Sequence, residues 1–386
     1  MSQESIADPH YEPGTHPSLP PPPMTTGWLG WIRQNLFSSP FNILLSALIV
    51  WLAYRVLFEG FFQWAFLDAV WVASSRDQCW DIMRARSADP NNPVYGACWA
   101  FILERWEQFF YGFYPREELW RPNLAFILWI GAMVPVLWDN CPHRGKLIWF
   151  SIAFPVIGYI LIFGGGIFPT VRTDQLGGLL LTLIIGITGI AVSLPVGILL
   201  ALGRRSDMPA IRIVCVCFIE FIRGVPLITL LFVASTMLNY FLPPGTTFDL
   251  LLRVVIMVSL FASAYMAEVI RGGLQAIPKG QSEAADALGL RYWQAMRLIV
   301  LPQALKISIP GIVNTFIGLF KDTTLVIVIG VLDLLGIGRA NTSDPNWGGL
   351  QPEVYTFVAL LFFIFCFAMS RYSLYLERKL DTGHKR

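Results

Sequence analysis

Long apolar stretches alternate with short polar ones along most of this chain, and this pattern predicts a bundle of membrane-spanning helices. About 20 consecutive apolar residues are enough for a helix to cross the hydrocarbon core of a bilayer. The second candidate stretch is the weakest, because it is short and contains Pro135. The eight predicted spans are Phe41–Phe62, Leu124–Trp138, Leu147–Phe168, Gly178–Leu202, Ile211–Tyr240, Leu250–Ile270, Ile309–Leu332 and Val354–Tyr375. The predicted fold class is therefore all-α, a polytopic membrane protein with about eight transmembrane helices.

Composition agrees with a membrane protein and excludes several other classes. The 386 residues are 55% hydrophobic and 14% charged, whereas soluble domains carry about a quarter charged residues. A net charge of +2 is too small to suggest a nucleic acid partner. No metal-ligand spacing, phosphate-binding glycine loop, zinc-protease motif or hydrolase serine motif is present. We therefore predict no metal site, no catalytic residue and no enzyme activity in this chain.

The polar stretches divide the chain into predicted regions. Residues 1–26, with a run of four prolines, are typical of a disordered tail. Because no hydrophobic run follows a basic start there, we expect no signal peptide in this segment. Residues 27–174 hold three spans and a Trp-rich polar insertion at 63–123. Residues 175–376 hold the remaining five spans with a polar interval at 271–308, and residues 377–386 form a second tail.

The short loops predict how the spans are oriented. Cytoplasmic loops carry the excess of Lys and Arg. One side holds Arg144, Lys146, Arg204, Arg205, Arg212, Arg271, Lys279, Arg291, Arg297, Lys306 and the basic residues after the last span. The short loops of the other side hold only Arg172, Arg339 and, at a span end, Arg253. The long insertion at 63–123 also carries arginines, but long loops follow this rule poorly. Both termini and the polar interval at 271–308 are thus predicted to be cytoplasmic, and the Trp-rich insertion faces outward.

Two cysteines of the outward insertion lie in what would be an oxidising compartment. Cys79 and Cys98 are therefore candidates for a disulfide. Spacing alone does not decide connectivity, so a bond and two free thiols both stay open.

The polar interval contains signals for two short helices. Ser282 is suited to cap a helix over Glu283–Leu288, and Gly289 is suited to the left-handed turn that ends it. Tyr292–Val300 is expected to form a second helix that stops before Pro302, which lacks a backbone N–H. A short helix held rigidly at the end of a membrane bundle is suited to a mechanical contact with another protein.

The same residues resemble the cytoplasmic coupling loop of ABC importer permeases. That loop has the pattern Glu-Ala-Ala, three residues, Gly, nine residues, Ile-x-Leu-Pro. Every position is matched without insertion, by Glu283, Ala284, Ala285, Gly289, Ile299, Leu301 and Pro302. The resemblance implies that these residues couple the membrane helices to a separate ATPase subunit. The bland alternative is an amphipathic loop helix that only links two spans.

The resemblance extends over about residues 175–375, which are similar to the polar amino-acid subfamily of these permeases. Its signposts are Gly178 with Thr182-Leu183, the segments Glu220–Leu227 and Ala267–Gly273, Pro278–Gln281, and Lys321–Leu325. Val225 stands where the family usually has Thr, a mild departure. The resemblance implies a five-helix type I ABC importer core. The three additional spans look like those of the larger permease subunit of the general L-amino-acid importer.

The resemblance also implies a function and its partners. The chain would be the permease subunit of an ATP-driven importer of L-amino acids in a bacterial inner membrane. It would form a heterodimer with a second permease subunit and work with a cytoplasmic ABC ATPase dimer, which binds ATP and Mg. A periplasmic amino-acid-binding protein is also implied. Our hypothesis is that it docks on the outward loops Leu242–Phe248 and Gly336–Glu353, whose Pro, Gly and Asn content suits exposed turns. This chain itself would hold no cofactor.

Charged residues inside the spans are candidates for the substrate pathway, because ionisable groups at membrane depth are costly and usually face a cavity or a partner. An amino-acid zwitterion needs a cationic and an anionic or carbonyl partner. The candidates are Glu220, Arg223, Glu268, Lys321 and Asp322. The pairs Glu220–Arg223 and Glu268–Arg271 are each three apart on one helix face, so mutual neutralisation is the alternative, favoured for the second pair. Gly224 and Pro226 are expected to kink the fifth span.

Two other classes of membrane protein remain open at this point. A secondary amino-acid transporter driven by an ion gradient usually shows paired inverted halves with broken helices, and no internal repeat is evident here. A membrane scaffold or channel would have no reason to keep the complete coupling-loop spacing.

Overall fold

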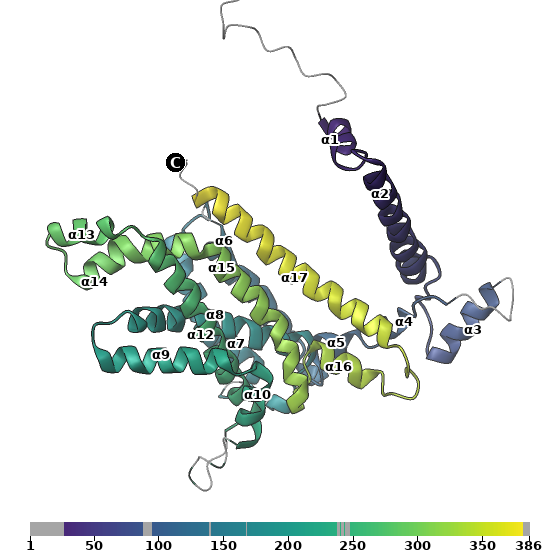
Figure 1. Cartoon of the computed structure of the whole chain (residues 1–386). Helices are drawn as coiled ribbons and strands as arrows, with labels where there is room; N and C mark the ends of the chain where they lie inside the picture. The colour runs from purple at the N-terminus through teal and green to yellow at the C-terminus, as the bar shows by residue number, and fades with distance from the viewer. Residues whose placement is uncertain are drawn as a thin grey trace, which may run out of the picture. The chain divides into compact units, whose positions relative to one another are not determined.

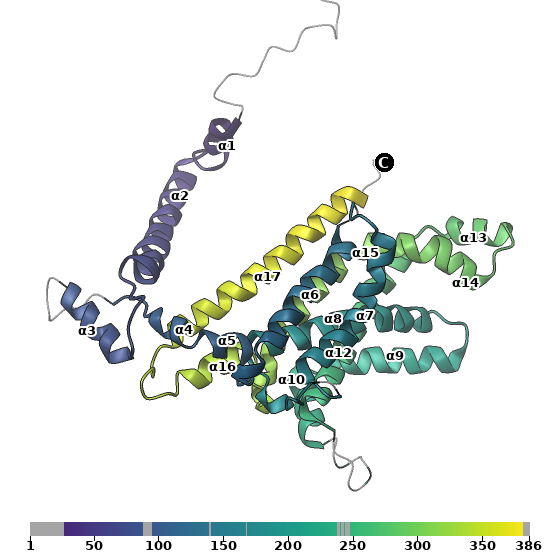
Figure 2. The same cartoon turned by 180° about the vertical axis from the view of Figure 1, so that it is seen from behind.

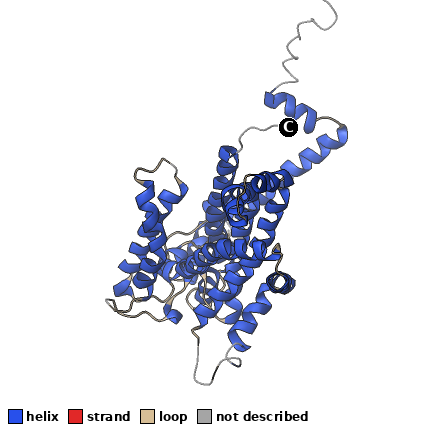
Figure 3. Cartoon of the chain, turned by 90° about the vertical axis from the view of Figure 1, so that its left-hand side faces the viewer, coloured by secondary structure: helices blue, strands red, loops and turns tan. Residues whose placement is uncertain are grey.

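The structure is a computed structural model that describes residues 27–87, 95–138, 140–166, 168–237, 240, 243 and 248–380. These residues form helices and loops without a strand, as the blue and tan colouring of Figure 3 shows. In hydrocarbon the backbone must satisfy its own hydrogen bonds, and a helix does so within one segment. The all-α prediction is confirmed. The tail at 1–26 and residues 381–386 of the second tail lie outside the described part.

Within the described residues, seven helices are long and apolar enough to cross a membrane, and a broken pair makes an eighth. The seven are Pro40–Leu67, Arg116–Leu137, Arg144–Phe163, Gly178–Arg204, Leu250–Ala276, Tyr292–Ile329 and Gln351–Leu380. The eighth comprises Pro209–Gly224 and Leu227–Met237, which are bent by 103°. The kink expected at Gly224 and Pro226 is thus a full break, because proline cannot donate to the preceding turn.

The chain divides into two compact units. The first consists of residues 1–69 and 83–97, and the helices α1 (Gly27–Asn35) and α2 (Pro40–Ala53) belong to it (Figure 1). α2 continues without interruption into the π-helix η1 (Tyr54–Leu67), so that the two form one span. Within this unit the N–H of Ala97 donates to the carbonyl of Trp64 at 2.8 Å.

The second unit consists of residues 70–82 and 98–386 and holds all the other spans; α3 (Arg76–Arg86) crosses the boundary between the units. Figures 1 and 2 show its helices from opposite sides. Its first half contains α4 (Ala100–Glu104), α5 (Trp106–Tyr111), η2 (Arg116–Glu118), α6 (Trp120–Leu137), α7 (Arg144–Phe163), η3 (Thr173–Gln175), α8 (Gly178–Arg204), α9 (Pro209–Gly224), α10 (Leu227–Phe232) and η4 (Val233–Met237). Its second half contains α12 (Leu250–Ala276), α13 (Lys279–Ala287), α14 (Tyr292–Ala295), η5 (Met296–Val300), α15 (Leu301–Asp322), η6 (Thr323–Ile329), α16 (Leu334–Asn341) and α17 (Gln351–Leu380).

The centre of the second unit is α12, which packs along α8 on one side and α15 on the other. Small residues allow this close approach. A Cβ atom added to Gly197 would lie 2.6 Å from Cγ of Met266, and one added to Gly273 would lie 2.5 Å from the carbonyl oxygen of Ala304. Small residues at helix contacts are typical of membrane bundles, in which association depends on tight packing rather than on burial from water.

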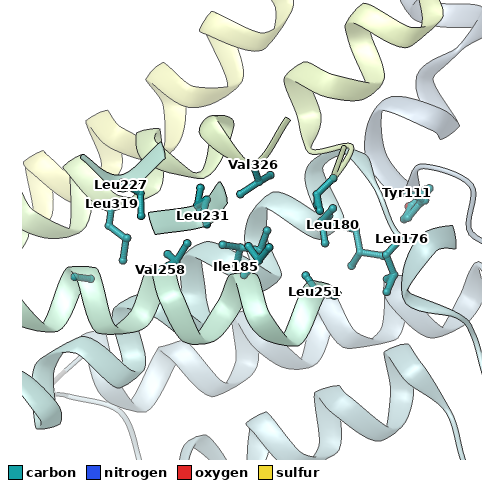
Figure 4. Packing of buried hydrophobic residues seen from close by; sticks show 14 of the residues in the cluster. Tyr111, Leu176, Leu180, Ile185, Leu227, Leu231, Leu251, Val258, Leu319 and Val326 are labelled. Atoms are coloured by element: carbon teal, nitrogen blue, oxygen red, sulfur yellow. The ribbon is translucent and has the colours of Figure 1, made fainter. Parts of the chain in front are cut away.

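Two apolar clusters fill opposite ends of this helix arrangement. The first joins α5, α8, α10, α12 and η6, and Figure 4 shows its members, among them Leu180, Leu231 and Val326. The second joins α8, α9, α12, η5 and α15 through residues such as Ile270 and Val300. The second cluster matters for function because it includes part of the polar interval.

The Trp-rich insertion is attached to the loop between α16 and α17. Cys79 and Cys98 form a disulfide, and the N–H of Cys98 donates to Oε1 of the buried Glu353 at 3.1 Å. Arg105 forms an ion pair with Asp344. Three further contacts complete this set, which is called the clamp below. The backbone N–H of Arg76 donates to the carbonyl of Asn346 at 2.8 Å, and Nη1 of Arg76 donates to the carbonyl of Gly348 at 3.0 Å. The rings of Phe101 and the buried Trp347 lie 5.5 Å apart.

Removing the disulfide is expected to destabilise this clamp. The bond links residues 19 positions apart, and closing a loop of that size contributes about 3 kcal/mol in the chain-entropy account. Cys98→Ser should therefore lower the unfolding temperature of the purified protein, and a reducing agent should do the same to the wild type. Cys217→Ser replaces an exposed free thiol and is the matched control. It should leave unchanged both the unfolding temperature and its decrease on addition of a reducing agent. Equal unfolding temperatures for Cys98→Ser and wild type would contradict the expectation.

Asp333 is a buried carboxyl at the start of α16, outside the spans. Its Oδ1 accepts the N–H of Gly336 at 2.9 Å, while its Oδ2 has no partner within the described residues. Burial raises the pKa of Asp333 from 3.8 to about 7, although the hydrogen bond from Gly336 acts in the opposite direction. The folded protein therefore binds this proton more tightly than the unfolded chain does.

This raised pKa predicts the sign of a pH dependence. Protonated Asp333 stabilises the fold below about pH 4, and that contribution is lost as the pH rises through about 7. Asp333→Asn keeps an acceptor for the helix cap but cannot ionise. The variant should thus gain stability relative to wild type from pH 5 to pH 8, by at most about 4 kcal/mol. Thermal unfolding at several pH values tests this, and a constant difference would contradict it.

Candidate coupling loop and charged cluster

The segment that resembles a coupling loop forms a compact helical turn between α12 and α15, and it is called the coupling loop below. Its helix α13 begins at Lys279 after Pro278, so Ser282 lies inside the helix and the prediction that Ser282 caps it is wrong. Pro278 is the residue that precedes the helix, and its ring fixes its φ at −59°, so the chain enters the helix directly after it rather than at Ser282. α13 ends before Gly289, whose φ of +72° lies in the left-handed region as expected.

The positions of the motif have different environments. Glu283 and Ala284 are exposed, whereas Ala285 is fully buried. Gly289 donates its N–H to the carbonyl of Asp286 at 2.9 Å, and Leu290 donates to the carbonyl of Ala285 at 3.1 Å. These two bonds close the end of α13 and direct the chain back towards α14. One face of α13 is thus packed against the protein and the other is presented outward.

Exposed apolar side chains surround this loop, and sequence reasoning did not single them out. Leu288 is 77% exposed, Tyr292 54% and Trp293 66%, with the two aromatic rings 5.3 Å apart. Large apolar groups grouped at a polar tip are typical of a protein contact. The available signal was a Tyr-Trp pair inside an otherwise polar interval.

The segment after α14 connects the loop to the bundle. Met296 and Val300 of η5 are buried in the second apolar cluster, together with Ile270 of α12 and Ala201 of α8. Because packed interiors deform little, a displacement of the loop moves this cluster with it.

The expected stop at Pro302 is wrong, since Tyr292–Ile329 runs as one helical span. Pro302 lies in the first turn of α15, where the missing N–H is tolerated because the preceding π-turn absorbs it. Of the other motif residues, Ile299 accepts a hydrogen bond from Nε2 of Gln303 at 2.9 Å, and Leu301 packs against the second cluster.

A cluster of five charged side chains joins α8, α9 and α12. Glu268 lies at its centre and is 15% exposed, whereas Glu220 is 54% exposed. The carboxylate of Glu268 is 2.7 Å from Nη1 of Arg204, 2.7 Å from Nη2 of Arg271 and 3.7 Å from Nη1 of Arg223. Three guanidinium groups therefore share one carboxylate.

This arrangement differs from the two separate pairs expected from helix spacing. Glu220 forms its ion pair with Arg204 at 2.8 Å rather than with Arg223. Arg223 instead reaches Glu268 and lies 5.5 Å above the ring of Tyr265. Sequence reasoning counted Arg204 only as a loop charge, because nothing local brings the end of α8 to α9 and α12.

The other two pathway candidates end α15 and point apart. Lys321 is exposed, whereas Asp322 lines a cavity of about 290 Å³ between α12 and α15. The cavity is also lined by Tyr265 and Asn314, with Phe261, Ala262, Thr315, Gly318 and Leu319 completing it. Tyr265 thus borders both the cavity and Arg223. The structure brings Asp322 and the charged cluster to two sides of one tyrosine, and it places Lys321 outside the cavity.

Comparison with known proteins decides the family. Residues 193–382 match the inner membrane component of binding-protein-dependent transport systems. The chain is 50% identical over 372 residues to the inner membrane amino-acid ABC transporter permease protein YhdY of Escherichia coli (strain K12), covering 96% of this chain and 97% of YhdY. The chain belongs to this permease family.

Two further relatives differ in how much of this permease they cover. BztC of Rhodobacter capsulatus, a glutamate/glutamine/aspartate/asparagine transport system permease protein, is 48% identical over 95% of this chain and 96% of its own. The glutamate/aspartate import permease protein GltK of Escherichia coli O6:H1 is 31% identical over 53% of this chain and 92% of its own. The permease is therefore a multi-pass inner-membrane protein and one subunit of an ABC transport complex. The alternative of a secondary transporter is not supported.

Proposed function

We propose that this permease is the membrane-spanning subunit of an ATP-driven importer of L-amino acids, with α13 as the contact to a cytoplasmic ATPase dimer. The observation that supports the ATPase contact is the complete motif, whose first part lies on α13 with Glu283 exposed and Ala285 packed inward. Leu288 and Trp293 extend the apolar contact surface beside it. Amino acids are the proposed cargo because YhdY and BztC, which match almost the whole chain, are amino-acid permeases by name.

The partners follow from the same reasoning. A second, homologous permease would complete the translocation path, and the ATPase dimer would supply the bound ATP and Mg. ATP binding would close the ATPase dimer, draw the two coupling loops together and open the bundle outward. η5 supports this transmission, because it follows the loop directly and its Met296 and Val300 belong to the second apolar cluster. Both termini and α13 are proposed to be cytoplasmic, as the positive residues of the short loops indicate.

A periplasmic binding protein would deliver the substrate to the outward face. The loop hypothesis for that contact needs a correction for 336–353, because α16 occupies 334–341 and Trp347 is buried. Only Ser343, Pro345, Asn346 and Gly349 remain exposed between α16 and α17. The clamp from the Trp-rich insertion would hold these residues in one conformation, which lowers the ordering cost of binding. Most of Leu242–Phe248 lies outside the described residues.

The cavity at Asp322 is the proposed substrate path within this subunit. Asp322 supplies a carboxylate for an α-ammonium group, and Asn314 supplies an amide for either end of a zwitterion. Arg223, which lies across Tyr265, supplies the cation for a carboxylate. Glu220 and Glu268 would hold Arg204 and Arg223 in place beside the path rather than touch the cargo.

Reconstitution tests the proposed function. Liposomes would be prepared with the permease, a candidate companion permease and a candidate ATPase. The binding protein would be added on the side of the outward face, and uptake of labelled glutamate, glutamine and leucine would be measured. ATP-dependent uptake that needs every subunit is the expected result. Uptake driven by an ion gradient without ATP, or labelling of a cysteine in α13 from the periplasm, would contradict the proposal.

A further inference from the structure

An apolar cavity of about 510 Å³ lies between the hairpin α6–α7 and the core helix α8. It is separate from the coupling loop, the charged cluster and the cavity at Asp322. Its lining comes from three helices that each meet the length and hydropathy of a membrane span. The lining residues are Pro122, Ala125, Phe126, Trp129, Phe154, Pro155, Gly158, Tyr159, Ile162, Phe163, Leu180, Leu183, Ile184, Ile187, Thr188, Ala191, Val192 and Pro195.

The chemistry of the lining excludes polar occupants. Among the residues that the structure describes, the lining contains no charged side chain, and its only polar side-chain groups are those of Trp129, Tyr159 and Thr188. An amino acid would leave both of its charges unpaired here, at a large cost. Water also needs two to four polar partners to be stable in a cavity. The occupant is therefore apolar.

The shape of the cavity excludes another helix. The lining runs from Leu180 to Pro195, which corresponds to about 22 Å along α8. A helix about 10 Å wide would fill roughly 1,700 Å³ over that length, whereas all the empty space at this seam, its open side included, is about 1300 Å³. The space is therefore too small for a helix, and its size and its extent along α8 suit an extended hydrocarbon chain.

The surroundings of the cavity supply such chains. Pro155, Tyr159, Ala191 and Val192 of the lining are exposed, so the cavity opens sideways at membrane depth, where the solvent is lipid. The hairpin α6–α7 also lies outside the part that matches the permease family, residues 193–382. GltK aligns over 92% of its own chain with only 53% of this one, so it is too short to carry all the additional spans. Without the hairpin, this face of α8 would border lipid.

We propose that an acyl chain of a bilayer phospholipid occupies this cavity and fills the seam between the hairpin α6–α7 and α8. An empty seam would leave its apolar lining without van der Waals contacts on one side. A lipid chain restores those contacts and loses no hydration, because it comes from an apolar medium. The bound lipid thereby joins the additional spans to the core.

Photo-crosslinking tests the site directly. The full chain, purified with its partner subunits, would be placed in nanodiscs of phosphatidylethanolamine and phosphatidylglycerol that contain a trace of phosphatidylethanolamine with a diazirine in one acyl chain. After illumination, mass spectrometry locates the label. Label concentrated on residues 154–163 and 180–195 is the expected result. Label spread evenly over lipid-facing positions such as Ile127 and Ile152, both exposed, would overturn the proposal.

A matched pair of variants separates the cavity from the general lipid surface. Ala191→Phe adds volume inside the lining, whereas Ala153→Phe adds the same volume on an exposed position of α7 outside it. Label on residues 180–195 should fall about tenfold in the first variant and stay unchanged in the second, because an added ring occupies the space of the chain. Unchanged labelling in a correctly inserted Ala191→Phe protein would overturn the proposal. The wild-type label distribution decides the question even if that variant fails to insert.

Discussion

Replacing Gly289 by proline is expected to abolish ATP-dependent uptake while leaving membrane insertion unchanged. Gly289 has a φ of +72° and donates its N–H to the carbonyl of Asp286. Proline holds φ near −65° and has no N–H, so the variant loses both features. The end of α13 should be destabilised by about 3 kcal/mol or more. The population with an intact α13 end should then fall by about a hundredfold. Labelled amino-acid uptake by the reconstituted complex measures the result.

The control for this variant is Gly272→Ala. Gly272 lies within α12, and an added Cβ would meet no atom within 4 Å, so alanine should leave uptake near the wild-type level. Glu283→Ala is a second probe, because it removes an exposed motif side chain without changing the backbone; it should uncouple ATP hydrolysis from uptake. Normal transport by Gly289→Pro would show that this turn does not couple the ATPase to the bundle.

The second large effect is expected at Glu268. Glu268→Gln leaves Arg204, Arg223 and Arg271 without the carboxylate that they share. Removing one partner of a buried ion pair costs about 3–5 kcal/mol. The three arginines are 23–34% exposed, so solvent screens part of the effect of their unpaired charges. The free energy of unfolding is therefore expected to fall by about 2–3 kcal/mol. Thermal unfolding and uptake of the same preparations should both decline.

Glu220→Gln is the matched comparison at the edge of the same cluster. Glu220 is 54% exposed and, within the described part of the chain, forms an ion pair only with Arg204, so its loss should change stability by less than about 1 kcal/mol. The double variant Glu268→Gln/Arg271→Gln should be more stable than Glu268→Gln alone, because it also removes the charge of one arginine that has lost its carboxylate partner. Equal effects of the two glutamate variants, or a double variant worse than the sum, would argue against a shared carboxylate.

Much of the permease could be predicted from its residues alone, for a local physical reason. Spans depend on the length of apolar stretches, which explains why the all-α class and the number of spans agree with the structure. Gly289 has the left-handed conformation that was expected. Few other residues adopt this conformation without strain, so the glycine itself is a local signal. The errors at Ser282 and Pro302 concern where helices begin and end, which depends on a neighbouring proline and a π-turn.

Other features needed the tertiary structure, because they join residues that are distant in the sequence. Helix spacing indicated Glu220–Arg223 and Glu268–Arg271 as pairs, but the packing of α8 against α12 brought in Arg204 and made one cluster. The same kind of non-local packing created the apolar seam between α6, α7 and α8. The sequence by itself thus determined which segments cross the membrane and where the coupling motif lies, since these depend on local hydropathy and backbone chemistry. Only the tertiary structure decided which charges meet and which cavities form, because side-chain pairing and packing depend on how helices cross in space.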